Sequence, residues 1–439
     1  MQRIDDRSLV AAEKPELTVL PTPELNAETP AHLLDEDITP TDRLFVRNTG
    51  FMPGFSDAEL AAWMLTIDGC VRAPRRFSLD ALKRDFETVS QIAVMECAGN
   101  GRAFFKEQTS TVLWGHGAAG CPRWTGVRLG DVLRACGVTA EAVYTGHHSP
   151  DLYLDDSGPA LSRGLPIAKA LAPETMLAFG LNGAPLPPIH GGPLRIIAPG
   201  YPGAASQKWL TRIELRDREH DGERMAGLHY RMPRVPMQPG DPIDESLFDV
   251  ITDMPVRSVI TFPADGARLP AGTKKLDLRG HTWAGDNEVK SVDISTDYGA
   301  TWKTAKVDAP KNKFAWQRFT ASIDLPTSGY YEVWSRATDA KGATQPFQAA
   351  NWNPQGYGGN PVAYLVEEDE LNADYTNFWI FTEEGLKRIV RRAGWDIPRR
   401  PRGGGAVPRS PSPRSAGAGP RASRAARPAG RDPIGTRGS

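Results

Sequence analysis

Residues 90–102 read SQIAVMECAGNGR and are the most informative stretch of the chain. The first half, Ser90 to Met95, is apolar and β-branched, which is typical of a buried strand. The glycines of AGNGR then predict a tight loop, because glycine adopts backbone angles that other residues avoid. Cys97 stands at the junction, and Arg102 is well placed to lower the pKa of its thiol. A thiolate there could be a nucleophile or a ligand to a soft metal, and a buried structural cysteine is the alternative.

The segments on either side alternate between helical and strand signals, which favours a mixed α/β domain. Ser78 is a good N-cap for the amphipathic run that follows it. A second helix is expected over Leu129–Ala135, with Gly137 as its stop. Strands are expected over Met176–Leu181 and Leu194–Ala198. Loops on such a scaffold commonly carry functional side chains.

The sequence changes character from Pro255 onward. Six short alternating runs, punctuated by Gly, Pro and Asp, follow one another with no helical segment between them. This pattern predicts a β-sandwich of immunoglobulin-like size, without the cysteine pair of antibody domains. The expected fold class is therefore α+β, a mixed α/β domain followed by a sandwich. The six runs are Val256–Phe262, Lys275–Gly280, Val289–Ser295, Trp302–Val307, Trp316–Ile323 and Tyr330–Ala337.

The two ends of the chain differ from this body. Residues 1–40 are rich in Pro, Glu and Asp and are expected to form an irregular arm. Gln238–Asp244 is a plausible linker, and a capping box at Thr382 predicts a helix over Thr382–Gly394. The Arg-, Pro- and Gly-rich residues after it are expected to be disordered. The expected organisation is an arm (1–40), a mixed domain (41–235), a sandwich (251–366), a helical appendix (367–397) and a tail (398–439).

Composition sets further limits. The formal net charge is −1, but the ten arginines and one aspartate after residue 398 carry a net charge of +9, which leaves −10 on residues 1–398, so no nucleic-acid partner is expected for the folded body. Four cysteines without a CxxC pair exclude a zinc ribbon, a thioredoxin-type site and covalent c-type haem, so no haem is expected. No run approaches the roughly 20 apolar residues of a membrane span, and no signal peptide is recognisable. We therefore expect a cytoplasmic protein, or a periplasmic one if the start is mis-set.

A second polar cluster surrounds glycine and proline in PIHGGPLR, residues 188–195, followed by Lys208. Its His, Arg and Lys side chains suit an anionic ligand such as a phosphate, with a structural turn as the alternative. Arg47 lies in an apolar, strand-like context, where a plain salt bridge is the default interpretation. For Tyr230 the default is a packed aromatic ring.

Taken in order, these motifs resemble those of the sulfite oxidase family of molybdenum enzymes. The resemblance covers residues 42–366, and CAGNGR followed by RWTGV and by an HGxPxR segment is a specific combination. The motifs are FVRN (45–48), ECAGNGR (96–102), WGHGAAGCPRWTGVRLGDVL (114–133), LNGAPLPPIHGGPLRIIAPG (181–200), KWL (208–210) and WNPQGY (352–357).

The resemblance implies a catalytic molybdopterin domain followed by a Mo-co oxidoreductase dimerisation domain, in an enzyme that oxidises sulfite to sulfate with water as the oxygen source. Cys97 would ligate molybdenum. The implied catalytic residues are Arg47, Cys97, Arg102 and Tyr230. The implied cofactor-binding residues are Arg47, Asn48, Cys97, His148, His190, Arg195, Ser206 and Lys208. The implied substrate pocket is formed by Arg47, Arg102, Trp114 and Gln355.

Two positions depart from the family pattern. Gln355 stands where animal and plant members have an Arg that reaches the substrate pocket, and His148 stands where an Asp near the pterin is usual. Losing one charge-assisted contact would cost on the order of 1.5–3 kcal/mol of anion binding. The substrate that the resemblance implies is therefore sulfite or a related sulfur oxyanion, with a sulfane dehydrogenase-like activity as the alternative and a non-catalytic binding protein as a third hypothesis. The resemblance also implies a homodimer and an external electron acceptor such as cytochrome c.

Overall fold

The computed structural model describes residues 2–4, 6–105, 112–346 and 352–359. The expected appendix (367–397), the helix predicted within it and the tail (398–439) lie outside these residues. No helix in the described ranges is both long and apolar enough to cross a membrane.

Both helices expected within the described residues are confirmed. The first follows Ser78, whose hydroxyl accepts a hydrogen bond from the amide of Ala81 at 3.1 Å. The second ends at Gly137, which adopts φ +73°, a left-handed conformation that suits glycine. The α-helices of the described part of the chain are α1 (Asp6–Glu13), α2 (Asp57–Ala61), α3 (Leu79–Asp85), α4 (Leu129–Cys136) and α5 (Ile167–Ala170).

The mixed domain is built on two main sheets. Their strands are β6 (Met64–Gly69), β7 (Arg75–Ser78), β8 (Thr88–Ile92), β11 (Arg123–Arg128), β12 (Tyr144–His148), β13 (Met176–Leu181), β14 (Ala184–Pro185), β15 (Arg195–Ile197) and β16 (Arg212–Arg216). One sheet has the order β14–β13–β11–β8, with β15 also paired to β13. The other has the order β12–β16–β6–β7, and its β16–β6 pair is parallel. The two strands expected at β13 and β15 are thus present.

The strand expected over Ser90–Met95 is interrupted. β8 ends at Ile92, and a separate short strand, β9 (Met95–Glu96), pairs with β10 (Ala119–Gly120). The break has a physical cause, because the amide of Val94 donates to the carbonyl of Phe314 at 2.9 Å instead of extending the sheet. Phe314 belongs to the C-terminal half of the chain, so a tertiary contact overrides the local strand preference.

The first 40 residues are not irregular, contrary to the expectation from their composition. After α1 come β2 (Thr18–Val19) and β3 (Asn26–Glu28), and β3 pairs with β4 (Val46–Arg47). Single apolar residues of this segment, such as Leu25 at 1% exposure, pack into the core of the mixed domain. The sequence did not reveal these buried apolar residues, because they are too widely spaced among proline and acidic residues to give a periodic signal.

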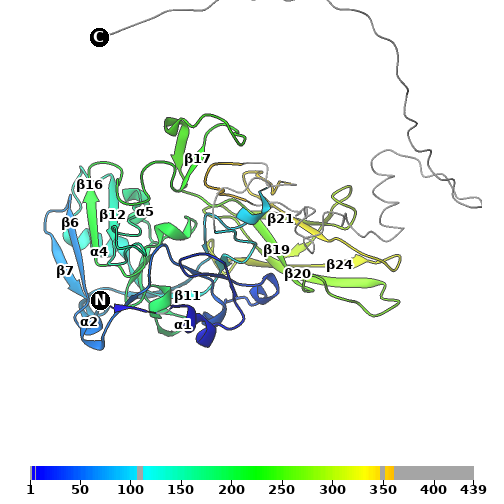
Figure 1. The fold of residues 1–439 in the computed structure, drawn as a ribbon, viewed down its shortest axis with the longest axis horizontal. Coiled ribbons are helices and arrows are strands. Elements are labelled where there is room, and N and C mark those ends of the chain that lie inside the picture. Colours follow the sequence, from blue (N-terminus) through cyan, green and yellow to red (C-terminus); the bar gives the residue numbers. More distant parts are fainter. Residues whose placement is uncertain (1, 5, 106–111, 347–351, 360–439) are drawn as a thin grey trace, which may run out of the picture. The chain divides into compact units, whose positions relative to one another are not determined.

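The predicted β-sandwich is present. Its strands are β19 (Arg257–Phe262), β20 (Lys275–Trp283), β21 (Val289–Ser295), β22 (Lys303–Thr304), β23 (Lys306–Val307), β24 (Gln317–Asp324) and β25 (Trp334–Asp339). They form a four-stranded sheet, β19–β20–β24–β23, and a three-stranded sheet, β22–β21–β25. Val292 and Phe319, fully buried, lie in the core between them. In Figure 1, β19, β20 and β24 lie on one side of β11, and β6, β7, β12 and β16 lie on the other.

Two of the six predicted sandwich runs differ in detail. The run Trp302–Val307 divides at buried Ala305, so that β22 pairs with β21 in one sheet and β23 pairs with β24 in the other. The run Tyr330–Ala337 becomes regular only at Trp334, where β25 begins.

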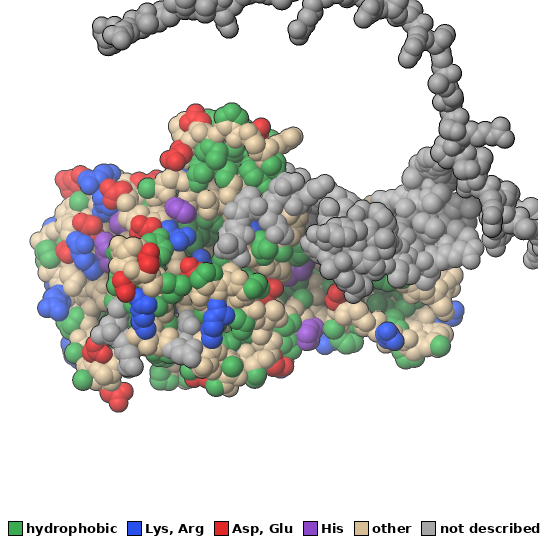
Figure 2. Space-filling model, in the orientation of Figure 1, with side chains coloured by type: hydrophobic (Ala, Val, Ile, Leu, Met, Phe, Trp, Pro, Cys, Tyr) green, Lys and Arg blue, Asp and Glu red, His purple; other side chains and the backbone are tan. Residues whose placement is uncertain are grey.

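The expected linker Gln238–Asp244 is the loop of a hairpin. It joins β17 (Arg231–Pro233) to β18 (Phe248–Val250), which pair antiparallel. Figure 2 shows apolar side chains gathered at and below the lobe that carries β17, and Val235, Ile243 and Leu247 are among the exposed apolar residues.

A buried ion pair joins the two domains. Glu96, at the end of β9, lies 2.7 Å from the Nε of Arg257 at the start of β19, and both side chains are at most 2% exposed. The same carboxylate accepts hydrogen bonds from Asn100 at 3.0 Å and from the indole of Trp283 at 2.7 Å. Its charge is therefore satisfied on both oxygens, as a buried carboxylate requires.

Replacing Arg257 by Met should lower the stability of the protein strongly. The change leaves the charge of Glu96 buried without its partner, which costs about 3–5 kcal/mol. The matched control is Arg234→Met, which breaks an exposed pair with Asp249 and should cost less than about 1 kcal/mol. Thermal unfolding of the full chain measures both, and equal shifts in Tm for the two variants would contradict the assigned role of the buried pair.

Candidate functional site

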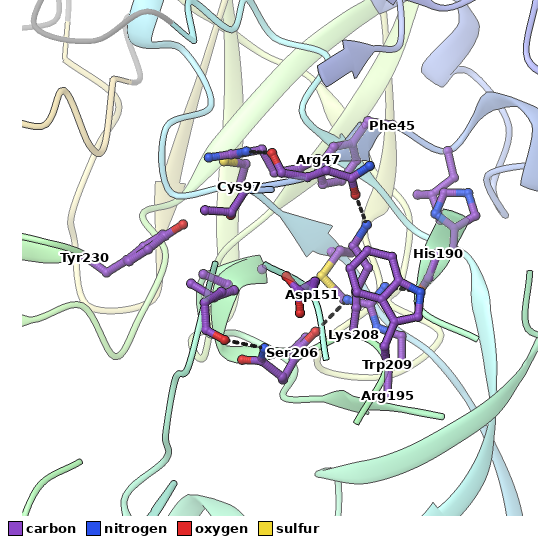
Figure 3. Close-up of a pocket in the computed structure, with 18 residues that line it drawn as sticks. Phe45, Arg47, Cys97, Asp151, His190, Arg195, Ser206, Lys208, Trp209 and Tyr230 are labelled. Atoms are coloured by element: carbon purple, nitrogen blue, oxygen red, sulfur yellow. Dashed lines mark hydrogen bonds between the residues drawn. The ribbon is translucent and has the colours of Figure 1, made fainter. Parts of the chain in front are cut away.

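A cavity in the mixed domain collects side chains from segments far apart in the sequence. The lining side chains come from β4, the loop after β9, the segment 190–195, the loop 203–209 and the residue before β17. Figure 3 shows Cys97 and Arg47 together at one wall, Tyr230 entering from one side, and His190, Lys208 and Trp209 on the other. The sequence-predicted site residues that line it are Arg47, Asn48, Cys97, His190, Arg195, Ser206, Lys208 and Tyr230.

Cys97 is held by the backbone of its own loop. Its amide donates to the carbonyl of Ala118 at 2.9 Å, and its carbonyl accepts from the amide of Asn100 at 2.9 Å. A Cβ at Gly99 would lie 2.4 Å from a guanidinium nitrogen of Arg102, and one at Gly101 would lie 1.9 Å from a carbonyl oxygen. Both glycines of the AGNGR stretch are therefore required for this close packing, and they leave the thiol at the cavity wall.

Two cations, Lys208 and Arg195, are fixed at the wall opposite Tyr230. Lys208 Nζ donates to Asn48 Oδ1 at 2.6 Å and to the carbonyl of Ile189 at 3.0 Å. Arg195 donates to the carbonyls of His190 and Ser206, each at 2.7 Å. These acceptors are all neutral oxygens, so the hydrogen bonds orient the two cations without neutralising their charge. This arrangement suits an anionic group such as a phosphate.

Burial of this wall shifts the pKa values of its basic groups downward. The pKa of Arg195 is lowered to about 9 by desolvation. The pKa of His190 is lowered well below its usual value, first by burial and then by the nearby Lys14, Lys208 and Arg195. His190 is therefore a neutral imidazole at physiological pH, and its buried Nε2 has no hydrogen-bond partner within the described residues. A neutral ring with an open nitrogen can bind a polar cofactor group.

Arg47 reaches the cavity from the end of β4. Its backbone is in register with Asn26 of β3, and its Nη1 donates to Asn26 Oδ1 at 3.2 Å and to the carbonyl of Asn48. Asn26 is fully buried and is itself tied to Thr22 at 2.8 Å. The N-terminal segment therefore fixes the direction of this arginine, which the sequence did not predict.

Asp151 and Gln207 are cavity residues that the sequence analysis missed. Asp151 follows β12, is buried, and accepts a hydrogen bond from Ser149 at 2.5 Å. Burial raises its pKa, and the hydrogen bond from Ser149 and the charge of Lys208 oppose the shift. Gln207 donates to Ser149 at 2.6 Å. An acidic residue three positions after His148, in a loop that follows a strand, was the signal that could have identified Asp151.

Four predicted site residues do not line the cavity. His148 lies on β12 and faces Arg212 and Glu214 of β16, so the structure places Asp151, not His148, beside the other cavity residues. Trp114 is fully buried and packs edge-on against Phe45. Arg102 and Gln355 are hydrogen-bonded to each other, and neither lines the cavity.

Arg102 is fixed by backbone carbonyls next to the Cys97 loop. Its guanidinium donates to Gln355 and Gly356 at 3.0 and 3.3 Å and to Val112 at 2.8 Å. Gln355 therefore holds Arg102 through its carbonyl oxygen, whatever its side chain. Burial lowers the pKa of Arg102, and the thiol of Cys97 is the first group that opposes this shift, which places charge and thiol close together.

The described residues contain no group of three or more His, Cys, Asp and Glu side chains placed to hold a metal ion. Such a cluster therefore does not supply a metal site here, and Cys97 is the cysteine among the residues that line the cavity. A thiolate favours soft or high-valent transition metals bound to sulfur donors.

Two family models match the chain. The model described as "Oxidoreductase molybdopterin binding domain" matches residues 52–224, and the one described as "Mo-co oxidoreductase dimerisation domain" matches residues 248–364. Among solved structures, the sulfane dehydrogenase SoxCD from Paracoccus pantotrophus is similar with a TM-score of 0.66 and 26% identity, covering 82% of this chain and 89% of that one.

Curated relatives include several sulfite oxidases. The sulfite oxidase of Gallus gallus is 31% identical over 78% of this chain and 76% of its own length. The mitochondrial sulfite oxidase of Drosophila melanogaster is 31% identical over 76% of this chain, which spans 60% of that protein. A nitrate reductase of Hordeum vulgare is 30% identical over 74% of this chain and 38% of its own length.

Replacing Gly191 by Ala should impair the retention of a bound anionic cofactor. The new Cβ would lie 2.7 Å from the side chain of Lys208 and displace its ammonium group, lowering affinity roughly tenfold or more. The measurement is the molybdenum content per purified chain. Gly183→Ala is the matched control, because Gly183 has a similar φ of +85° but no atom within 4 Å of an added Cβ. Equal molybdenum contents in the two variants would refute this role for Lys208.

Proposed function

This chain belongs to the sulfite oxidase family, and from that premise we propose that it is a molybdopterin-dependent enzyme that oxidises sulfite to sulfate. Water supplies the added oxygen, and two electrons and two protons leave the site for each sulfite oxidised. The observation that carries the proposal is the cavity itself, where one thiol, Cys97, shares a wall with Arg47 and faces a second wall of cations.

The residues present fit molybdopterin. Cys97 supplies the protein thiolate that the metal requires, and the cations Arg195 and Lys208 suit the phosphate of the pterin. The buried, unpartnered Nε2 of His190 fits a polar edge of the cofactor. When bound, the cofactor supplies the two-electron redox chemistry, and the protein binds, orients and tunes it.

The substrate would enter between Arg47 and Tyr230. The guanidinium of Arg47 lies beside Cys97, where it would attract a doubly charged sulfur oxyanion and offset its charge. The hydroxyl of Tyr230 points into the cavity from the facing side and would donate a hydrogen bond to the same oxyanion. Asp151, whose pKa is raised by burial, is close enough to the cavity to accept a released proton.

The proposal extends to partners. We propose that the electrons pass to an external acceptor such as a cytochrome c, and that two chains associate through the β-sandwich. The match of residues 248–364 to a dimerisation domain supports the second point.

A second candidate function is oxidation of a sulfane sulfur by the same cofactor. Two observations favour it, the similarity to the sulfane dehydrogenase structure and the Gln355 side chain at a position where an arginine would add a charge. A less charged or larger sulfur substrate would need that cation less than sulfite does.

Cys97→Ser should abolish sulfite-dependent reduction of ferricyanide while the protein still unfolds cooperatively near the Tm of the parent. A hydroxyl is a much poorer ligand for a sulfur-bound metal than a thiolate. Cys70→Ser is the control, since Cys70 is a free, partly buried cysteine that does not line the cavity. Sulfite turnover retained in Cys97→Ser would overturn the proposal.

Gln355→Arg should lower the KM for sulfite by about tenfold or more, because an arginine is longer than the glutamine, which does not line the cavity, and its guanidinium would add one charge-assisted contact for the anion. Gln317→Arg on β24 adds the same charge in the sandwich and should leave the KM unchanged. Steady-state kinetics with sulfite and, in parallel, a persulfide separate the two candidate functions. Turnover of the persulfide alone by the parent protein would favour the sulfane reaction.

A further inference from the structure

Four side chains form a stack beside the cavity. The ring of Tyr230 stacks on that of Tyr357, with centroids 5.3 Å apart and planes 15° from parallel. The guanidinium of Arg163 lies over the Tyr230 ring at 4.6 Å, and that of Arg102 lies over the Tyr357 ring at 5.5 Å. Each ring of the stacked pair therefore has a guanidinium over it, and one of the two tyrosines, Tyr230, lines the cavity. Cations over aromatic faces are attracted most strongly where water is excluded.

The backbone at Tyr230 is strained. Its φ is +54°, a left-handed conformation that is costly for an aromatic residue and persists only where its surroundings hold it. Its amide donates to the hydroxyl of Tyr357 at 3.2 Å, and its carbonyl accepts from the amide of Ile251 at 2.9 Å. The phenol hydroxyl is thereby pointed into the cavity (Figure 3). Strain at a cavity residue indicates that its direction matters to function.

Arg163 is an unusual residue for this position. It is 2% exposed, and within the described residues it has no ion pair with a carboxylate, while its Nε has no hydrogen-bond partner. Its Nη1 donates to the carbonyl of Arg224 at 2.6 Å, and its own amide donates to Oε1 of the cavity residue Gln207 at 3.2 Å. A buried cation without a carboxylate is costly, so it requires another favourable interaction. The Tyr230 ring provides one.

We propose that Arg163 is a positioning residue that holds Tyr230 in the cavity and supplies, from behind the ring, positive charge for a doubly charged sulfur oxyanion. The inference rests on the proposed function, and it deepens it by explaining how the site takes a dianion although position 355 is Gln. Arg47 offers a cation at the cavity wall itself. Arg163 acts through the tyrosine, whose hydroxyl becomes a better hydrogen-bond donor to an anion when a cation lies over its ring.

The test compares Arg163→Met with Arg163→Lys in the holoenzyme. Arg163→Met keeps the packing volume and removes the charge, so the KM for sulfite should rise about tenfold while kcat changes much less. The affinity of the resting enzyme for sulfate, measured by calorimetry, should fall by about the same factor. Arg163→Lys should recover a large part of both, which a purely structural role of the side chain does not predict.

A direct readout of Tyr230 comes from fluorine NMR of protein labelled with 3-fluorotyrosine, with the resonance assigned by Tyr230→Phe. One sharp signal is expected in the parent and in Arg163→Lys, and a shifted, broadened signal in Arg163→Met. Tyr357→Phe removes the hydroxyl that accepts from the Tyr230 amide and should also broaden the signal. This second variant keeps the test decisive if Arg163→Met does not fold.

The matched control is Arg336→Met, which removes a guanidinium lying 3.9 Å over the ring of Trp302 in the sandwich. It should leave the KM, sulfate affinity and Tyr230 resonance unchanged. If the parent oxidises sulfite and Arg163→Met matches it in all three measurements, the inference is overturned while the proposed function stands. If the parent lacks molybdenum or sulfite turnover, the proposed function fails, and the NMR signal still reports whether Arg163 orients Tyr230.

Discussion

The buried pair between Glu96 and Arg257 is the constraint on which the site depends. Two charges removed from water offset each other's burial when they form a close pair, and here Asn100 and Trp283 complete the hydrogen bonding of the carboxylate. Because Glu96 directly precedes Cys97, this polar centre fixes one end of the thiol-bearing loop against the first strand of the sandwich. The sandwich therefore supports the cavity geometry.

The cavity gains its electrostatic character from how its cations are bonded. Neutral oxygens, most of them backbone carbonyls, accept the hydrogen bonds that hold Arg195 and Lys208 in place, and the carboxyl group of Asp151 also interacts electrostatically with Lys208. Burial of these groups opposes their ionisation, as the lowered pKa of Arg195 shows. A bound anion relieves this cost. The cationic wall of the cavity therefore suits an anionic group.

Much of the local structure followed from the sequence because its causes are local. Ser78 caps α3 and Gly137 ends α4 through contacts within one turn. The break between β8 and β9 was not predictable, because Val94 bonds to Phe314, more than 200 residues away. Asp151 was missed for the same reason, since only the packing of β12 against β16 turns His148 aside and leaves Asp151 at the cavity.

The sequence by itself determined the two-part fold, the family resemblance and most of the candidate site, because alternating apolar runs indicate strands and because glycine and proline constrain the backbone directly. It also identified Tyr230 as a candidate site residue, but it did not show which contacts hold that side chain in place. Only the tertiary structure assembled the stack of Arg163, Tyr230, Tyr357 and Arg102, whose members are separated by up to 255 positions in the chain. Contacts between rings and cations at such separations leave no periodic trace, so geometry alone decides them.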